Sequence, residues 1–135
     1  MKTQNCLIRL IDNSKPDAVI IKKWWKQMGV DYDINSLPDT TFILECDGKL
    51  QYAVPVFYTN GDRIYIEDFI SDPELSSIDR INKSEVLLKA INDTAKEKGF
   101  KIIIGFAPDD KLLKRYEDLG FQKGLKIDII FKDIR

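Results

Sequence analysis

Hydrophobic and polar residues along this chain follow the spacings of both strands and helices. Apolar residues that alternate with polar ones, or form short runs, predict strands, and apolar residues three or four positions apart predict helices. The pattern predicts the order strand, helix, three strands, helix, strand, helix, strand. The expected strands are Cys6–Asp12, Phe42–Cys46, Lys49–Tyr58, Arg63–Ile70, Phe100–Phe106 and Leu125–Phe131, and the expected helices are 16–28, Ser84–Lys98 and 110–119.

Two short turns connect the three consecutive strands in the middle of the chain. Asp47-Gly48 joins the first two β-rich runs, and Asn60-Gly61 joins the second and third. Asp-Gly and Asn-Gly supply the positive φ angles that two-residue hairpin turns require. The three strands are therefore expected to run antiparallel, and Pro55, in the middle of one run, predicts a bulge or a sheet edge there.

The first helix has recognisable ends and an unusual tryptophan pair. Ser14 is a candidate N-cap, Asp17 suits the positive end of the helix dipole, and Gly29 is expected to end the helix in a left-handed conformation. Adjacent Trp24 and Trp25 suggest either ligand stacking or core packing. Core packing is favoured, because helical spacing places one of the pair on the buried stripe.

The fold class follows from the second half of the chain. A strand, a helix and an apolar strand in succession predict a parallel pair at the centre of a mixed sheet, and hence an α/β fold with helices on its faces. The N-terminus of the helix between these strands, Ser84–Lys98, would open at the carboxyl end of the first of them. Such a helix end is a ready site for an anion.

Composition narrows the functions that the chain can perform. The 135 residues leave room for one domain spanning 1–135, and 21 Lys+Arg against 22 Asp+Glu give a net charge of −1. This balance argues against nucleic acid as the main partner. The chain has 0 histidines, which excludes a histidine general base, a Ser-His-Asp or Cys-His pair and every histidine-containing zinc motif. No metal site is expected.

The two cysteines and the lack of long apolar runs predict where the protein resides. Cys6 and Cys46 are interpreted as small buried hydrophobes in a reducing compartment, in preference to a disulfide or a reactive thiol. No apolar run approaches the roughly 18 residues of a membrane span, and the N-terminus lacks the apolar core of a signal peptide. A cytoplasmic protein with no membrane partner is expected.

Two segments resemble a known superfamily. The chain reads IYIEDFISDPEL, then EVLLKAINDTAKEKGFKIIIGF, then LLKRYEDLGF, and in this order it resembles the GNAT superfamily of N-acetyltransferases. The similarity runs from about Thr40 to Gln122, and it rests most on IEDFISDPE (Ile66–Glu74) and RYEDLGF (Arg115–Phe121). The resemblance implies a GNAT-like mixed β-sheet whose central parallel strands splay apart to admit acetyl-CoA.

The resemblance also implies roles for individual residues. Tyr116 matches the tyrosine that protonates the leaving thiolate, and Glu67 matches the carboxylate that takes a proton from the acceptor amine. The backbone of Phe69, Ile70 and Ser71 matches the bulge that holds the pantetheine arm and the thioester. From the residues alone, Tyr116 reads as a packing residue at a helix boundary and Glu67 as a surface carboxylate.

The chain departs from the family where the coenzyme's diphosphate would bind. Family members wrap the diphosphate with a glycine-rich loop, and the matching coenzyme-binding residues here are Arg80, Ile81, Asn82, Lys83, Ser84 and Glu85. Side chains replace glycine at three of these positions and would crowd the ligand, although Arg80 or Lys83 can supply charge instead. Asp109 stands where the family usually carries Asn, and it brings a negative charge toward the coenzyme. Coenzyme binding is expected to be weakened.

Three functions remain open at this stage. The first is an N-acetyltransferase that moves an acetyl group to a small-molecule or peptide amine, which would enter beside the first helix and the acidic loop Val30–Thr40, where Asp31, Asp33 and Asp39 stand. The second is a binding or structural module that kept the scaffold and lost the chemistry, as in phage-encoded members with similarly glycine-poor loops. A third, weaker possibility is an α/β protein that binds another anionic cofactor at the same helix end.

Overall fold

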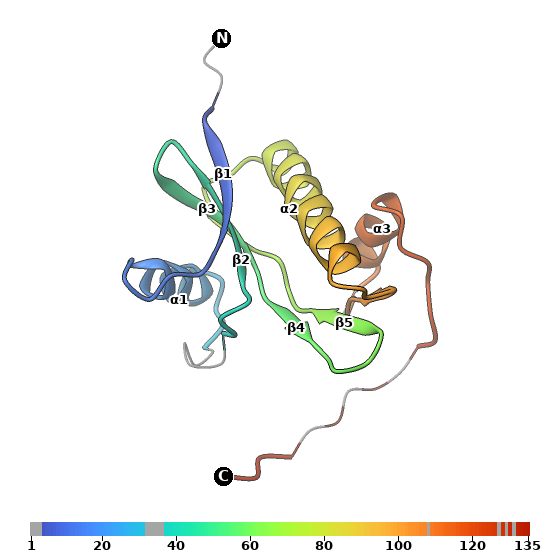
Figure 1. Ribbon diagram of the computed structural model, residues 1–135. Coiled ribbons are helices and arrows are strands. Elements are labelled where there is room, and N and C mark those ends of the chain that lie inside the picture. The colour runs from blue at the N-terminus through green and yellow to red at the C-terminus, as the bar shows by residue number, and fades with distance from the viewer. Residues whose placement is uncertain (1–3, 32–36, 108, 127, 129, 131) are drawn as a thin grey trace.

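The computed structural model describes residues 4–31, 37–107, 109–126, 128, 130 and 132–135. Helices cover both sides of a mixed sheet (Figure 1). The strands are β1 Cys6–Leu10, β2 Phe42–Cys46, β3 Lys49–Val54, β4 Val56–Tyr58, β5 Arg63–Ile66, β6 Ile70–Ser71 and β7 Ile102–Ile104. The helices are α1 Asp17–Gln27, α2 Ser77–Glu97 and α3 Asp110–Asp118.

The sheet consists of two parts, and the chain passes directly from one part to the other twice, from β3 into β4 and from β5 into β6. One part has the order β1-β2-β3-β6 and the other β4-β5-β7. The break between β3 and β4 falls at Pro55, as predicted, and the break between β5 and β6 falls at 67–69. The two interruptions face each other, since the Glu67 N–H donates to the Pro55 carbonyl at 3.0 Å. At this point the segment β3–β4 and the segment β5–β6 each pass from one part of the sheet to the other.

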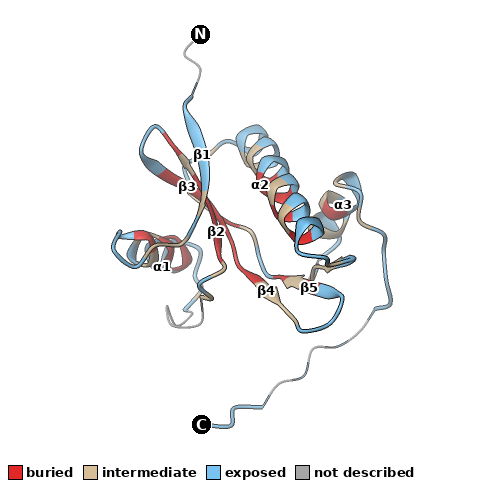
Figure 2. Cartoon of the chain, viewed as in Figure 1, coloured by how far each residue is buried: buried red, intermediate tan, exposed pale blue. Residues whose placement is uncertain are grey.

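Two buried clusters fill the two sides of the sheet (Figure 2). Helix α1 packs on one face, where Ile21, Trp24 and Trp25 are all buried with Ile43 and Ile70. Both tryptophans belong to this core, which confirms the prediction of core packing. The sequence placed one of the two on the buried stripe, and the structure buries both. On the opposite face α2 buries the apolar stripe predicted for it, which consists of Leu87, Leu88, Ile91 and Ala95.

The predicted turns are confirmed in part. Asp47 and Gly48 have φ values of 52° and 74°, so the β2–β3 hairpin has the expected left-handed turn. Strands β4 and β5 pair antiparallel as predicted. Their connection differs from the expectation, because Gly61 does not have a positive φ. Gly29 ends α1 with a φ of 77°, as its position after the helix predicts.

The beginnings of two helices differ from the predictions. Helix α1 begins after Pro16 and has no side-chain cap, and Ser14 instead bonds to Asp12. Helix α2 begins at Ser77, seven residues before the expected Ser84. Ser76 caps it by accepting a hydrogen bond from the Asp79 N–H at 3.1 Å. In these added turns Ile78 and Ile81 are exposed to solvent. The turns therefore have no buried apolar stripe, and hydrophobic periodicity does not predict them.

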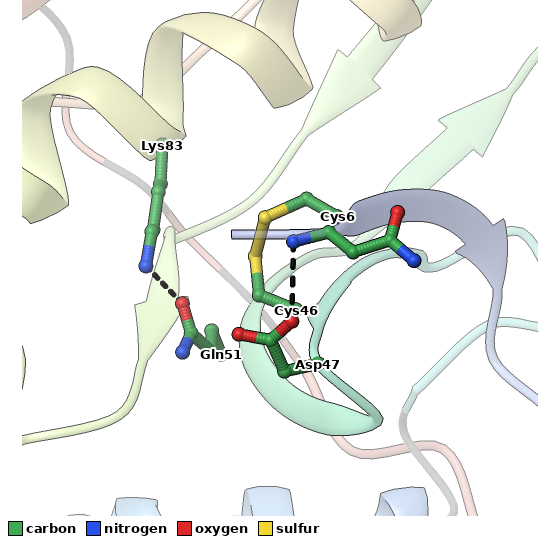
Figure 3. Close-up of a disulfide and its surroundings, with 6 residues drawn as sticks. Cys6, Cys46, Asp47, Gln51 and Lys83 are labelled. Atoms are coloured by element: carbon green, nitrogen blue, oxygen red, sulfur yellow. Dashed lines mark hydrogen bonds between the residues drawn. A yellow bond between two sulfur atoms is a disulfide. The ribbon is translucent and has the colours of Figure 1, made fainter. Parts of the chain in front are cut away.

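The expectation of reduced cysteines is wrong. Strands β1 and β2 are antiparallel, with Cys6 directly opposite Cys46, and the two form a disulfide (Figure 3). The Asn5 N–H donates to the Asp47 carboxylate beside the bridge at 3.1 Å. The partners are separated by 40 positions in the sequence, and only the pairing of the strands brings them together.

The C-terminal segment also differs from the prediction. The described residues of the expected strand Leu125–Phe131 lie outside any strand. Figure 1 shows the segment leading away from the sheet after α3, and Leu125 and Ile130 are each 92% exposed. Residues 127, 129 and 131 lie outside the described residues. Among the described residues, no helix is both long and apolar enough to cross a membrane.

Candidate functional site

The central parallel strands separate along their length. Strands β5 and β7 pair from Arg63 opposite Ile102 to Tyr65 opposite Ile104. After this pair β7 ends, and the chain that follows β5 joins the other part of the sheet, where β6 pairs with β3. The parallel ladder is therefore three pairs long, and its strands diverge at their carboxyl ends. In open α/β sheets, ligands commonly bind outside the carboxyl ends of the strands at such a point.

Tyr116 of α3 lies at the point of divergence. A Cβ placed on Gly105, the residue after β7, would lie 3.0 Å from the Tyr116 ring and 3.1 Å from its hydroxyl. The ring centroid is 5.6 Å from that of Phe69 and 4.9 Å from that of Phe121. The glycine thus allows the tyrosine to lie directly against the backbone at the carboxyl end of β7.

The Tyr116 hydroxyl is buried and makes no hydrogen bond to any residue that the structure describes. The residue is 4% exposed, and its Oη is among the buried polar atoms that lack a partner in that part of the chain. Burial, followed by the negative charge of Asp68, raises the pKa of Tyr116 to about 12. The phenol therefore keeps its proton at neutral pH. A buried polar atom without a partner is uncommon and is expected where a ligand group supplies the missing bond.

Two carboxylates lie on the segment that separates β5 from β6. Glu67 and Asp68 are both exposed, yet partial burial raises the pKa of each, and the charge of Asp68 raises that of Glu67 further. A raised pKa makes a carboxylate a better proton acceptor near neutral pH. Asp68, whose charge also acts on Tyr116, is absent from the predicted site. Its adjacency to Glu67 was the only sequence signal for it.

The predicted thioester-binding backbone lies beside the divergence. Phe69 packs against Tyr52 and Tyr116, at centroid distances of 6.1 and 5.6 Å. Ile70 and Ser71 form β6, which is an edge of its part of the sheet and pairs with β3 alone among the described strands. The structure therefore brings these residues to one side of the opening, with Tyr116 on the other.

The prediction that residues Arg80–Glu85 form a loop around the coenzyme's diphosphate is wrong. Arg80 to Glu85 lie inside α2, and the Arg80 N–H already donates to the Ser76 carbonyl at 3.0 Å. Main-chain N–H groups within a helix are occupied by the helix itself, so these residues cannot wrap a phosphate with their backbone. The reason lies in the sequence, since no glycine interrupts the segment and Ser76 caps the helix early.

Arg115, which the sequence did not single out, lies between α3 and α2. Its Nη2 donates to Ser84 Oγ and to the Arg80 carbonyl, both at 2.7 Å, and to the Tyr52 hydroxyl at 3.3 Å. Its guanidinium carbon is 5.8 Å from the centre of the Phe69 ring. All these acceptors are neutral, so the partly buried guanidinium has no opposite charge beside it among the described residues.

Two more cations, both on α2, have neutral partners. Arg80 donates to the Pro73 carbonyl at 2.8 Å, and Lys83 donates to the side-chain oxygen of Gln51 (Figure 3). The Nε atoms of Arg80 and Arg115 are buried, and neither has a partner in the described part of the chain. We call Arg80, Lys83 and Arg115 the cation cluster. Within the described ranges none of the three forms a salt bridge, and partly buried cations without a carboxylate partner can bind an anionic ligand.

The other acidic residues expected to act on a ligand are Asp109, Asp31, Asp33 and Asp39. Asp109 caps α3 by accepting a hydrogen bond from the Leu112 N–H at 2.8 Å, so its carboxylate is already engaged. Asp31 and Asp39 are exposed, and Asp33 lies outside the described residues. Within the part of the chain that the structure describes, no group of three or more Asp, Glu or Cys side chains could hold a metal ion.

Comparison with known proteins gives no match in sequence and many in structure. No family model and no curated protein matches the chain. A crystal structure of an aminoglycoside acetyltransferase from an uncultured soil metagenomic sample, in complex with trehalose, superposes with a TM-score of 0.71 at 16% identity, covering 96% of this chain and 97% of that one. The chain has the GNAT acetyltransferase fold.

Two further GNAT structures align over nearly their whole length. An aminoglycoside N-acetyltransferase in complex with CoA gives a TM-score of 0.68 at 15% identity, with 99% of this chain and 98% of that chain covered. Glucosamine-6-phosphate N-acetyltransferase from Arabidopsis thaliana gives 0.67 at 16% identity, with 95% and 99% covered. The GNAT fold expected from the sequence is thereby confirmed, whereas identities this low establish the fold alone.

Proposed function

We propose that this chain is an N-acetyltransferase that moves an acetyl group from acetyl-CoA to a primary amine. The observation that carries the proposal is the buried hydroxyl of Tyr116, which has no hydrogen-bond partner among the described residues and lies where the parallel strands diverge. It is a proton donor held next to the backbone at the place where the GNAT resemblance puts the thioester. Several similar structures are named for aminoglycosides or glucosamine-6-phosphate and one for a ribosomal-protein alanine. We propose an amino sugar as the amine, since amino-sugar acceptors are the more frequent of the two.

The proposed reaction is a direct attack. The neutral amine nitrogen forms a bond to the thioester carbonyl carbon, and the carbon–sulfur bond breaks. Glu67 takes the proton that the amine loses, and Tyr116 gives its proton to the departing thiolate. A carboxylate with a raised pKa and a phenol that stays protonated have the protonation states that these roles require at neutral pH.

The coenzyme would be held by side chains rather than by a main-chain loop. The cation cluster has the chemistry to bind a diphosphate, because among the described residues its three charges have only neutral partners and two of its nitrogens have none. Arginine forks match phosphate geometry. The helical backbone of Arg80–Glu85 does not fit the role that the family gives to its loop. We therefore propose that Arg80, Lys83 and Arg115 replace it, without a contribution from Asp109.

One set of observations favours the alternative, a GNAT-fold binding module without catalysis. The helical start of α2 removes the loop that binds the diphosphate in the family, and three aromatic rings pack together at the divergence. Two hollows in the surface, of about 660 and 390 Å³, are lined by other residues than Tyr116, Phe69 and Glu67. The cytoplasmic location and the phage origin inferred from the sequence stay predictions.

Thermal melting with acetyl-CoA separates the two functions. A ligand that binds the native state at a hundredfold excess over its dissociation constant stabilises it by about 2.7 kcal/mol, so the enzyme should melt at a higher temperature in millimolar acetyl-CoA. Arg115→Met should abolish this shift, whereas Arg63→Met, which changes an exposed arginine outside the cluster, should retain it. An unchanged melting temperature would reject the transferase in favour of the module.

If acetyl-CoA binds, the role of Tyr116 can be tested by turnover. We expect Tyr116→Phe to reduce acetyl transfer to glucosamine-6-phosphate or an aminoglycoside by about 100-fold, the size of a general-acid contribution, with the melting shift retained. Tyr58→Phe is the matched control, because Tyr58 stacks on Phe100 at the other end of β5. Equal rates for the two variants would remove Tyr116 from its assigned role.

A further inference from the structure

The part of the sheet that contains β4, β5 and β7 is covered by α2 on one face. Its residues Val56, Ile64 and Ile66 belong to the core cluster on which α2 packs. Side chains alternate between the two faces of a strand, so Phe57 and Tyr65, which belong to neither buried cluster, lie on the opposite face. Helix α1 packs on the other part of the sheet (Figure 1). Among the described residues, no helix therefore packs on this opposite face of β4, β5 and β7.

Three aromatic residues and an isoleucine line this face. Phe57 lies opposite Tyr65 in the β4–β5 ladder, and Tyr65 lies opposite Ile104 in the β5–β7 ladder. The ring of Phe106, two positions after the end of β7, stacks on that of Tyr65, with centroids 6.3 Å apart and an angle of 8° between the planes. All four residues are half-buried. We call Phe57, Tyr65, Ile104 and Phe106 the aromatic face.

The aromatic face ends at a bulge that carries two carboxylates. Ile66 and Phe69 both contact the core under α2 although they are three positions apart, so the segment between them holds one extra residue, as in a β-bulge. The Glu67 N–H still bonds to the residue before β4, and the alternation along the strand places Glu67 on the face of Tyr65. Glu67 and Asp68 are exposed, and neither forms a salt bridge with a described residue. Negative charge therefore lies at the end of the aromatic face that adjoins the divergence.

We infer that the aromatic face binds the ring of an amino-sugar acceptor and that Glu67 receives the amine of that sugar. The C–H groups on one side of a pyranose ring form an apolar surface that packs on aromatic rings, while the hydroxyls stay in water. A protonated amine is attracted by carboxylates and by the faces of aromatic rings. The inference rests on the proposed transferase for its choice of ligand, and it adds the residues that select the acceptor.

This arrangement brings the acceptor and the coenzyme to the opening from opposite faces. Tyr116, the proposed donor to the thiolate, belongs to the core under α2, whereas Glu67 lies on the face of Tyr65. The parallel ladder ends between them, so the amine and the thioester can meet there without a paired ladder in the way. An acceptor that enters from the aromatic face also leaves the α2 side, with its cation cluster, to the coenzyme.

Nuclear magnetic resonance of isoleucine methyl groups tests where the sugar binds. Two neighbouring residues of β7 report the two faces, because Ile103 packs against the core under α2 and Ile104 lies opposite Tyr65. We expect millimolar glucosamine-6-phosphate or sisomicin, added without acetyl-CoA, to shift the Ile104 signal and to leave that of Ile103 in place. No shift with either sugar, or a shift of Ile103 alone, would overturn the inference. An Ile104 shift in a protein whose melting temperature ignores acetyl-CoA would support the aromatic face and reject the transferase, so the two proposals fail separately.

Two stacked tyrosine–phenylalanine pairs provide matched variants. Tyr65 stacks on Phe106 on the aromatic face, and Tyr58 stacks on Phe100 on the α2 side, with centroids 6.3 and 5.4 Å apart. We expect Tyr65→Leu to raise the dissociation constant and the KM for the sugar about tenfold, with a smaller effect on kcat and with the acetyl-CoA melting shift retained. Tyr58→Leu should leave both constants unchanged, and circular dichroism verifies that each variant is folded. Equal effects of the two substitutions on sugar binding would contradict the inference.

Discussion

The two outer strands of the sheet, β1 and β7, differ in the contacts that hold them to the rest of the protein. At one edge, β1 pairs with β2 over five residues, is joined to it by the Cys6–Cys46 disulfide, and is tied to α1 through Arg9 and Asp17. At the other edge, β7 pairs over three residues and has no such fastening among the described residues. The disulfide, the buried ion pair and the longer ladder thus lie at the N-terminal edge, whereas the divergence and its proposed chemistry lie at the carboxyl end of β7.

Loss of the buried ion pair is the largest single change expected. Asp17 is 2% exposed, and its carboxylate accepts from both terminal nitrogens of Arg9, at 2.6 and 2.8 Å, and from the Asp12 N–H at 3.0 Å. Burial opposes ionisation of Asp17, but these bonds outweigh it and lower its pKa. Asp17→Ala leaves the guanidinium without its main partner, and we expect urea unfolding to show a loss of about 3 kcal/mol.

An exposed ion pair of similar length provides the control for Asp17. Lys89 and Asp93 lie 2.9 Å apart on the solvent face of α2. Exposed pairs at this helical spacing contribute about 0.3–0.5 kcal/mol, so Asp93→Ala should change the free energy of unfolding by no more than that. Equal losses of unfolding free energy for the two variants would show that the buried pair stabilises the protein no more than the exposed one does.

A methyl group at the divergence should have an intermediate effect. In Gly105→Ala the added Cβ would lie 3.0 Å from the Tyr116 ring, and the ring is held by Phe69 and Phe121. Crowding of this kind costs about 1–3 kcal/mol, and it should also move the hydroxyl. Denaturant unfolding measures the loss. Gly61→Ala is the control, since its nearest contact would be 3.7 Å away, and a similar loss there would refute the packing argument.

Alkaline pH should give the smallest effect and the one most specific to Tyr116. Its pKa is about 12 in the native state and about 10 when unfolded. A raised native pKa stabilises the protein fully below pH 10, and this stability is lost as the pH rises from 10 toward 12. By pH 11 the loss is about 1.4 kcal/mol. Tyr116→Phe should lack this component between pH 9 and 11, and parallel stability curves for the two proteins would contradict the assignment.

The sequence predicted those parts of the fold whose signals are local. Asp47-Gly48 carries its own backbone preference, and the stripe that contains Leu87 and Ile91 has helical periodicity. The first two turns of α2 carry exposed apolar residues without a stripe, so their helical state rests on capping by Ser76 and on the absence of glycine. The Cys6–Cys46 bridge depends on strand register over a distance of 40 positions, which no local pattern encodes.

The candidate site was predictable only where a family pattern exists. Tyr116 and Glu67 entered through the resemblance, and the structure places both near the divergence without testing their roles. Asp68 and Arg115 were missed because their importance is electrostatic. One carboxylate acts on a buried phenol, and one guanidinium has only neutral neighbours. Both properties depend on segments that are distant in the sequence and meet after folding.

The state of the disulfide, oxidised or reduced, reports the redox conditions under which the protein folded. Its two half-cystines are the only sulfhydryl sources in the sequence, and both belong to one bridge. An alkylating reagent applied to unfolded chains at the moment of cell lysis would therefore add either two labels or none to each molecule. The mass distribution would reveal the compartment in which the chain had matured, since glutathione keeps such bridges open in a reducing cytosol.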